Sequence, residues 1–247
     1  MQTSSRHFKN KIMYSIFLII VLLSALSIAY AVPTGPTITV IANETKQSVG
    51  GTLLNTSGGS IATIRLNATT QNTRWKAYVG NVSGSLSLDD AQDNKLFDWS
   101  LTQFMGEVYA TRSQQTINWT GINCSNATHI SLEEFAINHS NRDDNITKTF
   151  STQTHREFYA GTRQILANTC FSVHTYVNST SQATSFEEVV LYDGTNLTNG
   201  KIIYASPLEQ DLYGFDNSTY DFQMIVPENG QAGWQSSTAY YFYVELT

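Results

Sequence analysis

The chain has 247 residues, of which 14% are charged, with 14 Lys and Arg against 20 Asp and Glu. Soluble globular domains average about 25% charged residues, and here the deficit is filled by 30 Thr, 25 Ser and 19 Asn. The net charge of −6 disfavours a nucleic-acid partner, because phosphate binding requires a basic surface. An aromatic content of 12% argues against disorder, so we expect a folded chain.

The first 31 residues have the composition of a targeting segment. A basic start with three Lys or Arg residues precedes an apolar run over residues 12–29 and the tripeptide AYA that ends at Ala31. Ala29 and Ala31 place small residues at positions −3 and −1 of a cleavage site after Ala31, which predicts a signal peptide over residues 1–31. An uncleaved N-terminal membrane anchor is the alternative, because about 18 apolar residues can span a bilayer. In both cases residues 32–247 form an extracellular or cell-surface domain.

Cys124 and Cys170 are the only two cysteines. An even pair in an exported protein is typical of a disulfide, so we expect these two residues to be linked. In the chain-entropy model, closing a loop of about 47 residues contributes on the order of 4 kcal/mol. Two buried free thiols are the alternative.

Acceptor sequences for N-glycosylation, Asn-x-Ser/Thr, are in large excess. Twelve of the 19 Asn residues begin one, whereas the frequency of Ser and Thr predicts about four by chance. This excess predicts a glycosylated surface protein, with turn-like segments the best acceptors (Asn81, Asn145, Asn196 and Asn217). The complete set is Asn43, Asn55, Asn67, Asn81, Asn118, Asn123, Asn126, Asn138, Asn145, Asn178, Asn196 and Asn217.

Apolar and polar residues alternate at period two along the exported part, which indicates half-buried strands. The strands up to residue 101 follow one another as a β-meander, and the Pro-Glu-Asn-Gly sequence at 227–230 predicts a hairpin before the last strand. About ten strands favour an all-β fold, an antiparallel β-sandwich or jelly-roll-like domain. The predicted strands cover residues 38–42, 60–68, 75–79, 86–88, 97–101, 171–173, 189–191, 202–204, 220–226 and 240–247.

One short helix is predicted near Cys124. The sequence Ser131-Leu132-Glu133-Glu134 has the pattern of a capping box, and Leu132, Phe135 and Ala136 would share one face of the helix. Residues 138–155 lack periodicity and predict a loop.

The last predicted strand provides the clearest two-faced pattern. We expect its even-numbered apolar residues to point into one core, and its odd-numbered residues to lie on an opposite, exposed face. The first set is Tyr240, Phe242, Val244 and Leu246; the second is Tyr241, Tyr243 and Glu245.

No arrangement typical of an enzyme is present, so we expect neither catalysis nor a cofactor. Common hydrolase, zinc-protease and nucleotide-binding motifs are missing. Glycosidases need two converging carboxylates, but Glu187 and Glu188 are neighbours on a strand and point to opposite faces. Glu133 and Glu134 form a second carboxylate pair.

Metal binding also has little support in the sequence. The histidines lack metal-ligand spacing, and His174 is expected on the exposed face of its strand. Asp89, Asp90 and Asp93 offer oxygen ligands for Ca²⁺, but no EF-hand pattern surrounds them, and a solvated turn is the simpler interpretation. The scattered histidines of the exported part are His129, His139, His155 and His174.

Three segments carry a family resemblance: TRWKAYVGNVSGSLSLDD, LEQDLYGFDNSTYDFQMIVPENG and YYFYVEL. They resemble a family of secreted archaeal proteins of uncharacterised function, especially from the small-genome DPANN lineages. The similarity covers nearly all of the exported part, including both cysteine contexts. It implies an archaeal cell-surface setting, where N-glycosylation is common, and it implies no active site.

Two classes of function are compatible with these features. The first is a structural surface-layer, sheath or non-pilin filament subunit that self-associates through β-strand contacts. In this interpretation the extended segment 32–45 adds a strand to a neighbouring subunit, although the segment can equally pair within its own sheet. The second is an adhesion or lectin-like module, in which exposed aromatic rings stack on sugars.

Overall fold

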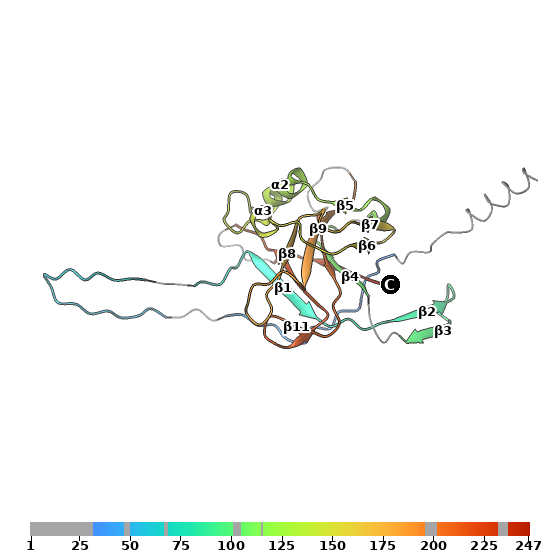
Figure 1. Ribbon diagram of the computed structural model, residues 1–247, viewed down its shortest axis with the longest axis horizontal. Helices are drawn as coiled ribbons and strands as arrows, with labels where there is room; N and C mark the ends of the chain where they lie inside the picture. Colours follow the sequence, from blue (N-terminus) through green and yellow to red (C-terminus); the bar gives the residue numbers. More distant parts are fainter. Residues whose placement is uncertain are drawn as a thin grey trace, which may run out of the picture. The chain divides into compact units, whose positions relative to one another are not determined.

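A six-stranded antiparallel sheet lies at the centre of the fold in the computed structural model (Figure 1). Its strands run in the order β14-β4-β10-β9-β5, and β8 also pairs with β9. The structure describes residues 32–46, 50–66, 69–100, 105–114, 116–195, 202–231 and 237–247. The predicted segment 1–31 lies outside these ranges, and within them no helix is long and apolar enough to cross a membrane.

The all-β class predicted from the sequence is confirmed, since the described residues form fourteen strands, paired antiparallel, and two α-helices. Strands of the central sheet are β4 (Gly106–Thr111), β5 (Asn123–Cys124), β8 (Ser172–His174), β9 (Glu187–Tyr192), β10 (Ile202–Pro207) and β14 (Tyr241–Leu246). The two-stranded pairs are β1 (Trp75–Gly80) with β13 (Phe222–Pro227), β2 (Ser85–Asp89) with β3 (Lys95–Ser100), β6 (Phe158–Ala160) with β7 (Arg163–Ile165), and β11 (Leu212–Tyr213) with β12 (Thr219–Tyr220). The helices are α2 (Ala127–Ala136), α3 (Ile146–Thr149) and the 3₁₀ turn η1 (Trp119–Gly121).

Strands β4, β9 and β10 are buried along their whole length, because both faces of the central sheet are covered. This explains why β9 and β10 contain apolar runs such as VVLY and IIYA instead of strict alternation. Residues of one parity, including Ala110, Val190 and Tyr204, enter a first core. Their neighbours Tyr109, Leu191 and Ala205 enter a second core on the opposite face.

The first core is closed by the β1–β13 pair and by both α-helices. Met224 from β13, Ile130 from α2 and Phe150 after α3 are all fully or almost fully buried against it. The Glu188 carboxylate on β9 accepts the Ile225 N–H at 2.8 Å, which joins β13 to the sheet. The second core is closed by the β6–β7 pair, by η1 and by the disulfide segment.

Long-range pairing replaces the meander predicted from the sequence. Strand β1 pairs with β13, with Trp75 opposite Pro227 and Gly80 opposite Phe222, and only β2–β3 forms the predicted local hairpin. The hairpin predicted at 227–230 is also wrong, since β13 pairs with β1 and β14 pairs with β4. The Gly230 N–H donates instead to the Ile137 carbonyl at the end of α2. Turn signals identify bends but not the partner of each strand.

Two predicted strands are not formed. Residues 38–42 and 60–66 have no strand partner and expose their apolar side chains, while residues 67 and 68 lie outside the described ranges. Conversely, β4 and the short β6–β7 pair were not predicted from the sequence. Their alternation is brief and includes Gly, Glu and Arg, so it resembles the surrounding loops.

The predicted helix exists, but it begins five residues earlier than expected. Asn126 is the N-cap, and its side chain and that of His129 form the reciprocal capping box. Ile130 and Glu133 face the interior, whereas Phe135, predicted on the buried face, is 79% exposed. Helix α3 lies within the stretch predicted as a loop and is also capped by an asparagine.

Strand β14 was predicted to have one buried and one exposed face, and on the second face Tyr241 is exposed as expected, whereas Tyr243 and Glu245 are not. Its even-numbered face packs on the first core as expected. On the other face, the Tyr243 ring meets the Trp119 ring at 5.4 Å, and Glu245 is only 1% exposed. Thr34 forms an isolated antiparallel bridge to Val244, so the start of the described chain pairs within its own sheet.

Candidate functional site

The acceptor asparagines lie mainly on the surface. Asn67 and Asn196 fall outside the described residues, and of the other ten only Asn145 is buried. Its side-chain oxygen accepts the Lys148 N–H at 2.9 Å and caps α3, so a glycan at Asn145 requires rearrangement of this turn. The exposed acceptors are Asn43, Asn55, Asn81, Asn118, Asn123, Asn126, Asn138, Asn178 and Asn217.

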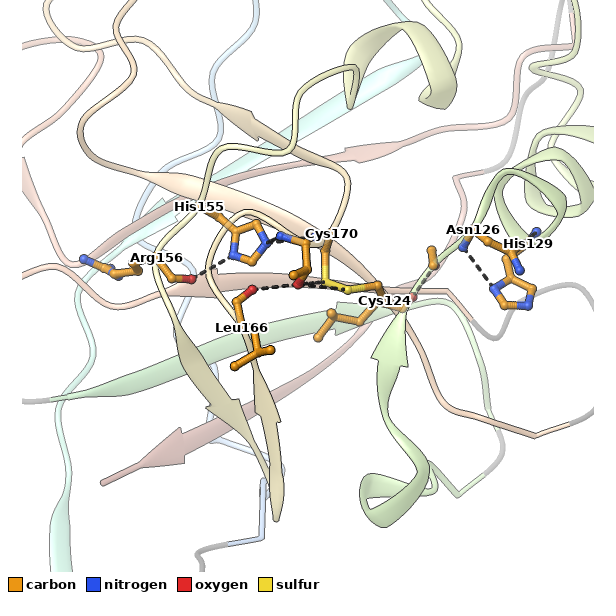
Figure 2. Close-up of a disulfide and its surroundings, with 10 residues drawn as sticks. Cys124, Asn126, His129, His155, Arg156, Leu166 and Cys170 are labelled. Atoms are coloured by element: carbon orange, nitrogen blue, oxygen red, sulfur yellow. Dashed lines mark hydrogen bonds between the residues drawn. A yellow bond between two sulfur atoms is a disulfide. The ribbon is translucent and has the colours of Figure 1, made fainter.

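The predicted disulfide between Cys124 and Cys170 is confirmed. Figure 2 shows His155 beside it, with Nε2 accepting the backbone N–H groups of Cys170 at 2.9 Å and Thr169 at 3.1 Å. The other ring nitrogen lies 2.7 Å from the Arg156 carbonyl, which assigns the proton to Nδ1. His155 therefore has a structural role in holding the segment that carries Cys170.

The other carboxylates and histidines singled out in the sequence are dispersed. Glu187 and Glu188 point to opposite faces, as expected, toward Arg156 and the Ile225 N–H respectively. Glu133 pairs with Arg112, and Glu134 accepts the Thr147 N–H. The His174 side chain is only 7% exposed, which corrects the expectation that it is exposed; its Nε2 lies 4.0 Å from the buried Glu187 carboxylate.

The described residues contain no group of three His, Cys, Asp or Glu side chains that could hold a metal ion. In the segment of Asp89, Asp90 and Asp93, where the sequence favoured a solvated turn over a Ca²⁺ site, Asp90 accepts the N–H groups of Gln92 and Asn94, each at 2.9 Å. Asp90 also accepts the Asn94 side-chain amide. These bonds explain the turn between β2 and β3 without a cation.

A buried acid pair, not anticipated from the sequence, lies on the second face of the central sheet. Glu107 on β4 and Glu245 on β14 are directly opposite in the antiparallel register. Glu245 accepts the Tyr109 hydroxyl at 2.9 Å and the Gly161 N–H at 2.8 Å. One oxygen of each carboxyl, Oε2 of Glu107 and Oε1 of Glu245, lacks a hydrogen-bond partner among the described residues.

Burial, and then the neighbouring Glu245, raises the pKa of Glu107 to about 8. Burial also raises the pKa of Glu245, although the Gly161 N–H and the Tyr109 hydroxyl oppose this shift. Like charges this close disfavour double ionisation, so the pair holds a proton near neutral pH. Both side chains are shielded from solvent, so the pair has no access for a substrate.

The β2–β3 hairpin presents an uncovered apolar face. Leu86 lies opposite Trp99 and Leu88 opposite Phe97, so all four side chains share one side. Each is between 41% and 55% exposed, and the Phe97 and Trp99 rings contact each other edge-on at 4.9 Å. We call this surface the hairpin face. Isolated two-stranded hairpins are marginal in water, so a hairpin of this composition needs a cover.

A second uncovered apolar region precedes β1. We call residues 35–46 and 50–66 the arm. Its apolar side chains are 54% or more exposed, and within the described residues its only backbone–backbone hydrogen bond is the Ser60–Ser57 turn. The most exposed are Ile38, Val40, Ile41, Leu53, Leu54, Ile61, Ile64 and Leu66.

The hairpin face and the arm are therefore the best candidate functional surface, and it is one of association. Large exposed apolar patches on soluble proteins mark sites of interaction. The sequence placed the relevant residues on strands and left segment 32–45 free to pair with its own sheet or with a neighbouring subunit, but it did not indicate that the β2–β3 hairpin would lack a cover. Comparisons with known proteins find no matching family model, no matching curated protein and no similar solved structure.

Proposed function

We propose that this protein is an exported, N-glycosylated structural component of the cell surface that acts through self-association. A surface-layer, sheath or non-pilin filament subunit has these properties. The observation that carries the proposal is the hairpin face, where Leu86, Leu88, Phe97 and Trp99 stand together without a cover.

Several features support this setting. The disulfide fits an oxidising compartment. Nine described acceptor asparagines are exposed, and a coat of glycans on them would limit nonspecific contact while leaving apolar surfaces for association. The packing of the β1–β13 pair on the central sheet supports a sandwich-like architecture. The archaeal setting rests on the resemblance of the sequence alone.

A carbohydrate-binding role is the second candidate, and Trp99 favours it. The ring is 49% exposed and is paired with Phe97, an arrangement that would allow stacking on a sugar. The two functions differ in a measurable way. Assembly requires contact between copies of the chain, whereas a lectin binds sugar as a monomer.

The test uses the full chain, expressed in a glycosylating archaeal host and recovered from the cell surface. We expect sedimentation velocity to detect multimers, and the double variant Leu88→Ser/Trp99→Ser to shift them to monomers without changing the far-UV circular dichroism. Phe135→Ser is the matched control, because this residue is 79% exposed but lies on α2, outside the hairpin face. It should leave the multimers unchanged.

A monomeric native protein at all accessible concentrations would contradict the structural proposal. If that monomer also bound glycans, and the double variant abolished binding, the lectin function would replace it.

A further inference from the structure

We propose that the hairpin face of one copy is covered by the arm of a second copy, so that subunits join head to tail. This inference rests on the proposed self-association and names the two surfaces that meet. The hairpin face is thus covered by the arm of another copy of this protein.

The arm has the sequence pattern of a β-strand but has no partner strand among the described residues of its own chain. Ala62, Ile64 and Leu66 alternate with the polar residues Thr63 and Arg65. Ile38, Val40 and Ala42 also recur at period two, although Ile41 between them is apolar as well. These stretches have no strand partner in the structure, and their apolar side chains are exposed. An extended segment with free backbone groups and one apolar side is the usual ligand in β-strand addition.

The arm leaves its own sheet for a local physical reason. Thr34 exchanges both backbone hydrogen bonds with Val244 on the outer edge of β14. Continuing this antiparallel register would place Pro36 opposite Phe242. Proline has no N–H to donate, so the pairing cannot continue as a regular ladder. The residues after Pro36 are therefore not held on the edge of β14.

Charge decides between a second hairpin and a second arm as the cover. Residues 85–100 carry four Asp and one Lys, a net charge of −3, so two hairpin faces repel each other. The arm carries Glu44, Lys46 and Arg65, a net charge of +1. The opposite charges of arm and hairpin favour contact between them, whereas the like charges of two hairpins disfavour contact between hairpins.

Pairing two different surfaces has a consequence for symmetry. An isologous contact closes a dimer, whereas a head-to-tail contact leaves one free arm and one free hairpin face on every dimer. Such contacts continue into a ring or an open filament. The small area of one hairpin, with strands of five and six residues, also suits an assembly held by repeated contacts better than a tight isolated dimer.

Complementary variants of the full chain test this directly. The arm variant carries Ile38→Ser, Val40→Ser, Ile64→Ser and Leu66→Ser. The hairpin variant carries Leu88→Ser and Trp99→Ser. We expect each to be monomeric alone, because each lacks one of the two surfaces. Mixed in equal amounts, they should form a one-to-one heterodimer that does not grow further, measured by native mass spectrometry. Phe135→Ser is again the control and should assemble like the parent protein.

A single charge change provides a second measurement if the hairpin variant fails to fold. Arg65→Glu converts the net charge of the arm from +1 to −1, and the Arg65 side chain is exposed. Association should weaken by roughly tenfold at low salt and by less at high salt.

Two results would overturn the inference. Continued multimers of the arm variant alone would indicate hairpin-to-hairpin contact, while self-association itself would stand. Unchanged affinity of the Arg65→Glu variant at low salt would also contradict the arm contact. A parent protein that never self-associates would remove the proposed function together with the inference.

Discussion

Strands β9 and β2 were both predicted from the sequence, but their surroundings are opposite. All six residues of β9 are buried, whereas all five residues of β2 are exposed. Strand β9 has neighbours on both edges and packed layers on both faces, while β2 has only β3 beside it. Burial of a strand is therefore set by the elements that cover it, and a favourable pattern alone leaves apolar side chains in solvent.

The largest difference in stability is expected between Ala variants of Phe150 and Phe97. Phe150 is fully buried in the first core, so Phe150→Ala should lower the free energy of unfolding by about 3–5 kcal/mol. Phe97 is 55% exposed, so Phe97→Ala should change the stability of the monomer by about 0.5 kcal/mol or less. Urea denaturation at a concentration that prevents association measures both. Equal losses would mean that the hairpin is packed in the monomer.

Removing the disulfide tests how the second core is held. Cys124→Ser/Cys170→Ser should lower stability by about 2–4 kcal/mol, since the bond closes a separation of 46 residues. His155→Ala should add to the loss, because the N–H groups of Thr169 and Cys170 would lose their acceptor. Thermal unfolding of the single and combined variants gives both effects. An unchanged melting temperature without the disulfide would show that the segment is fixed by other contacts.

The acid pair should make the central sheet more stable in acid. The folded pKa of Glu107, about 8, is above its ordinary value of 4.5. Its stabilising contribution is therefore complete below about pH 4.5 and is lost as the pH rises through about 8. Glu107→Gln, which stays neutral, should flatten this part of the profile by on the order of 2 kcal/mol. The difference between parent and variant across pH 5–9 isolates the pair from other groups, and identical profiles would contradict the assignment.

A smaller loss than for the core, the disulfide or the acid pair is expected at the start of α2. Asn126→Ala removes the side-chain acceptor of the His129 N–H, which should cost about 1 kcal/mol. Asn126→Ser retains a capping oxygen and removes the glycan acceptor, so it separates the cap from any effect of glycosylation. If Ser is as destabilising as Ala in glycosylated protein, the attached sugar is responsible for the loss.

Local alternation was sufficient to predict several elements. Trp75 to Val79, the β2–β3 hairpin and the stretches around Val189, Ile202 and Met224 are strands as expected. The disulfide also followed from the number of cysteines and the expectation that the chain is exported. The class of fold could therefore be predicted, because it depends on periodicity that each short segment carries by itself.

Pairing and two-sided burial could not be predicted in the same way. Nothing local in β13 indicates that its partner is β1, more than 140 residues earlier. Glu245 alternates with aromatic residues and was placed on an exposed face, yet it meets Glu107 in the interior. A buried carboxyl looks like a surface residue in sequence, because its burial depends on a hydroxyl and an N–H donated from distant segments. The hairpin face was missed for the converse reason, since its apolar residues resemble core strands, whereas association through segment 32–45 was one of the alternatives drawn from the sequence.

The pairing of β4 with β14 also determines when folding can finish. Their partnered residues are 130 to 140 positions apart, so β4 must wait until much of the chain has emerged before one edge of it is satisfied. Contacts this distant in sequence form slowly, and the unpaired edge is meanwhile open to other strands. The time spent with β4 uncovered therefore limits how fast this protein can be produced without misassembly, and a factor that shields one strand edge during synthesis would improve its yield.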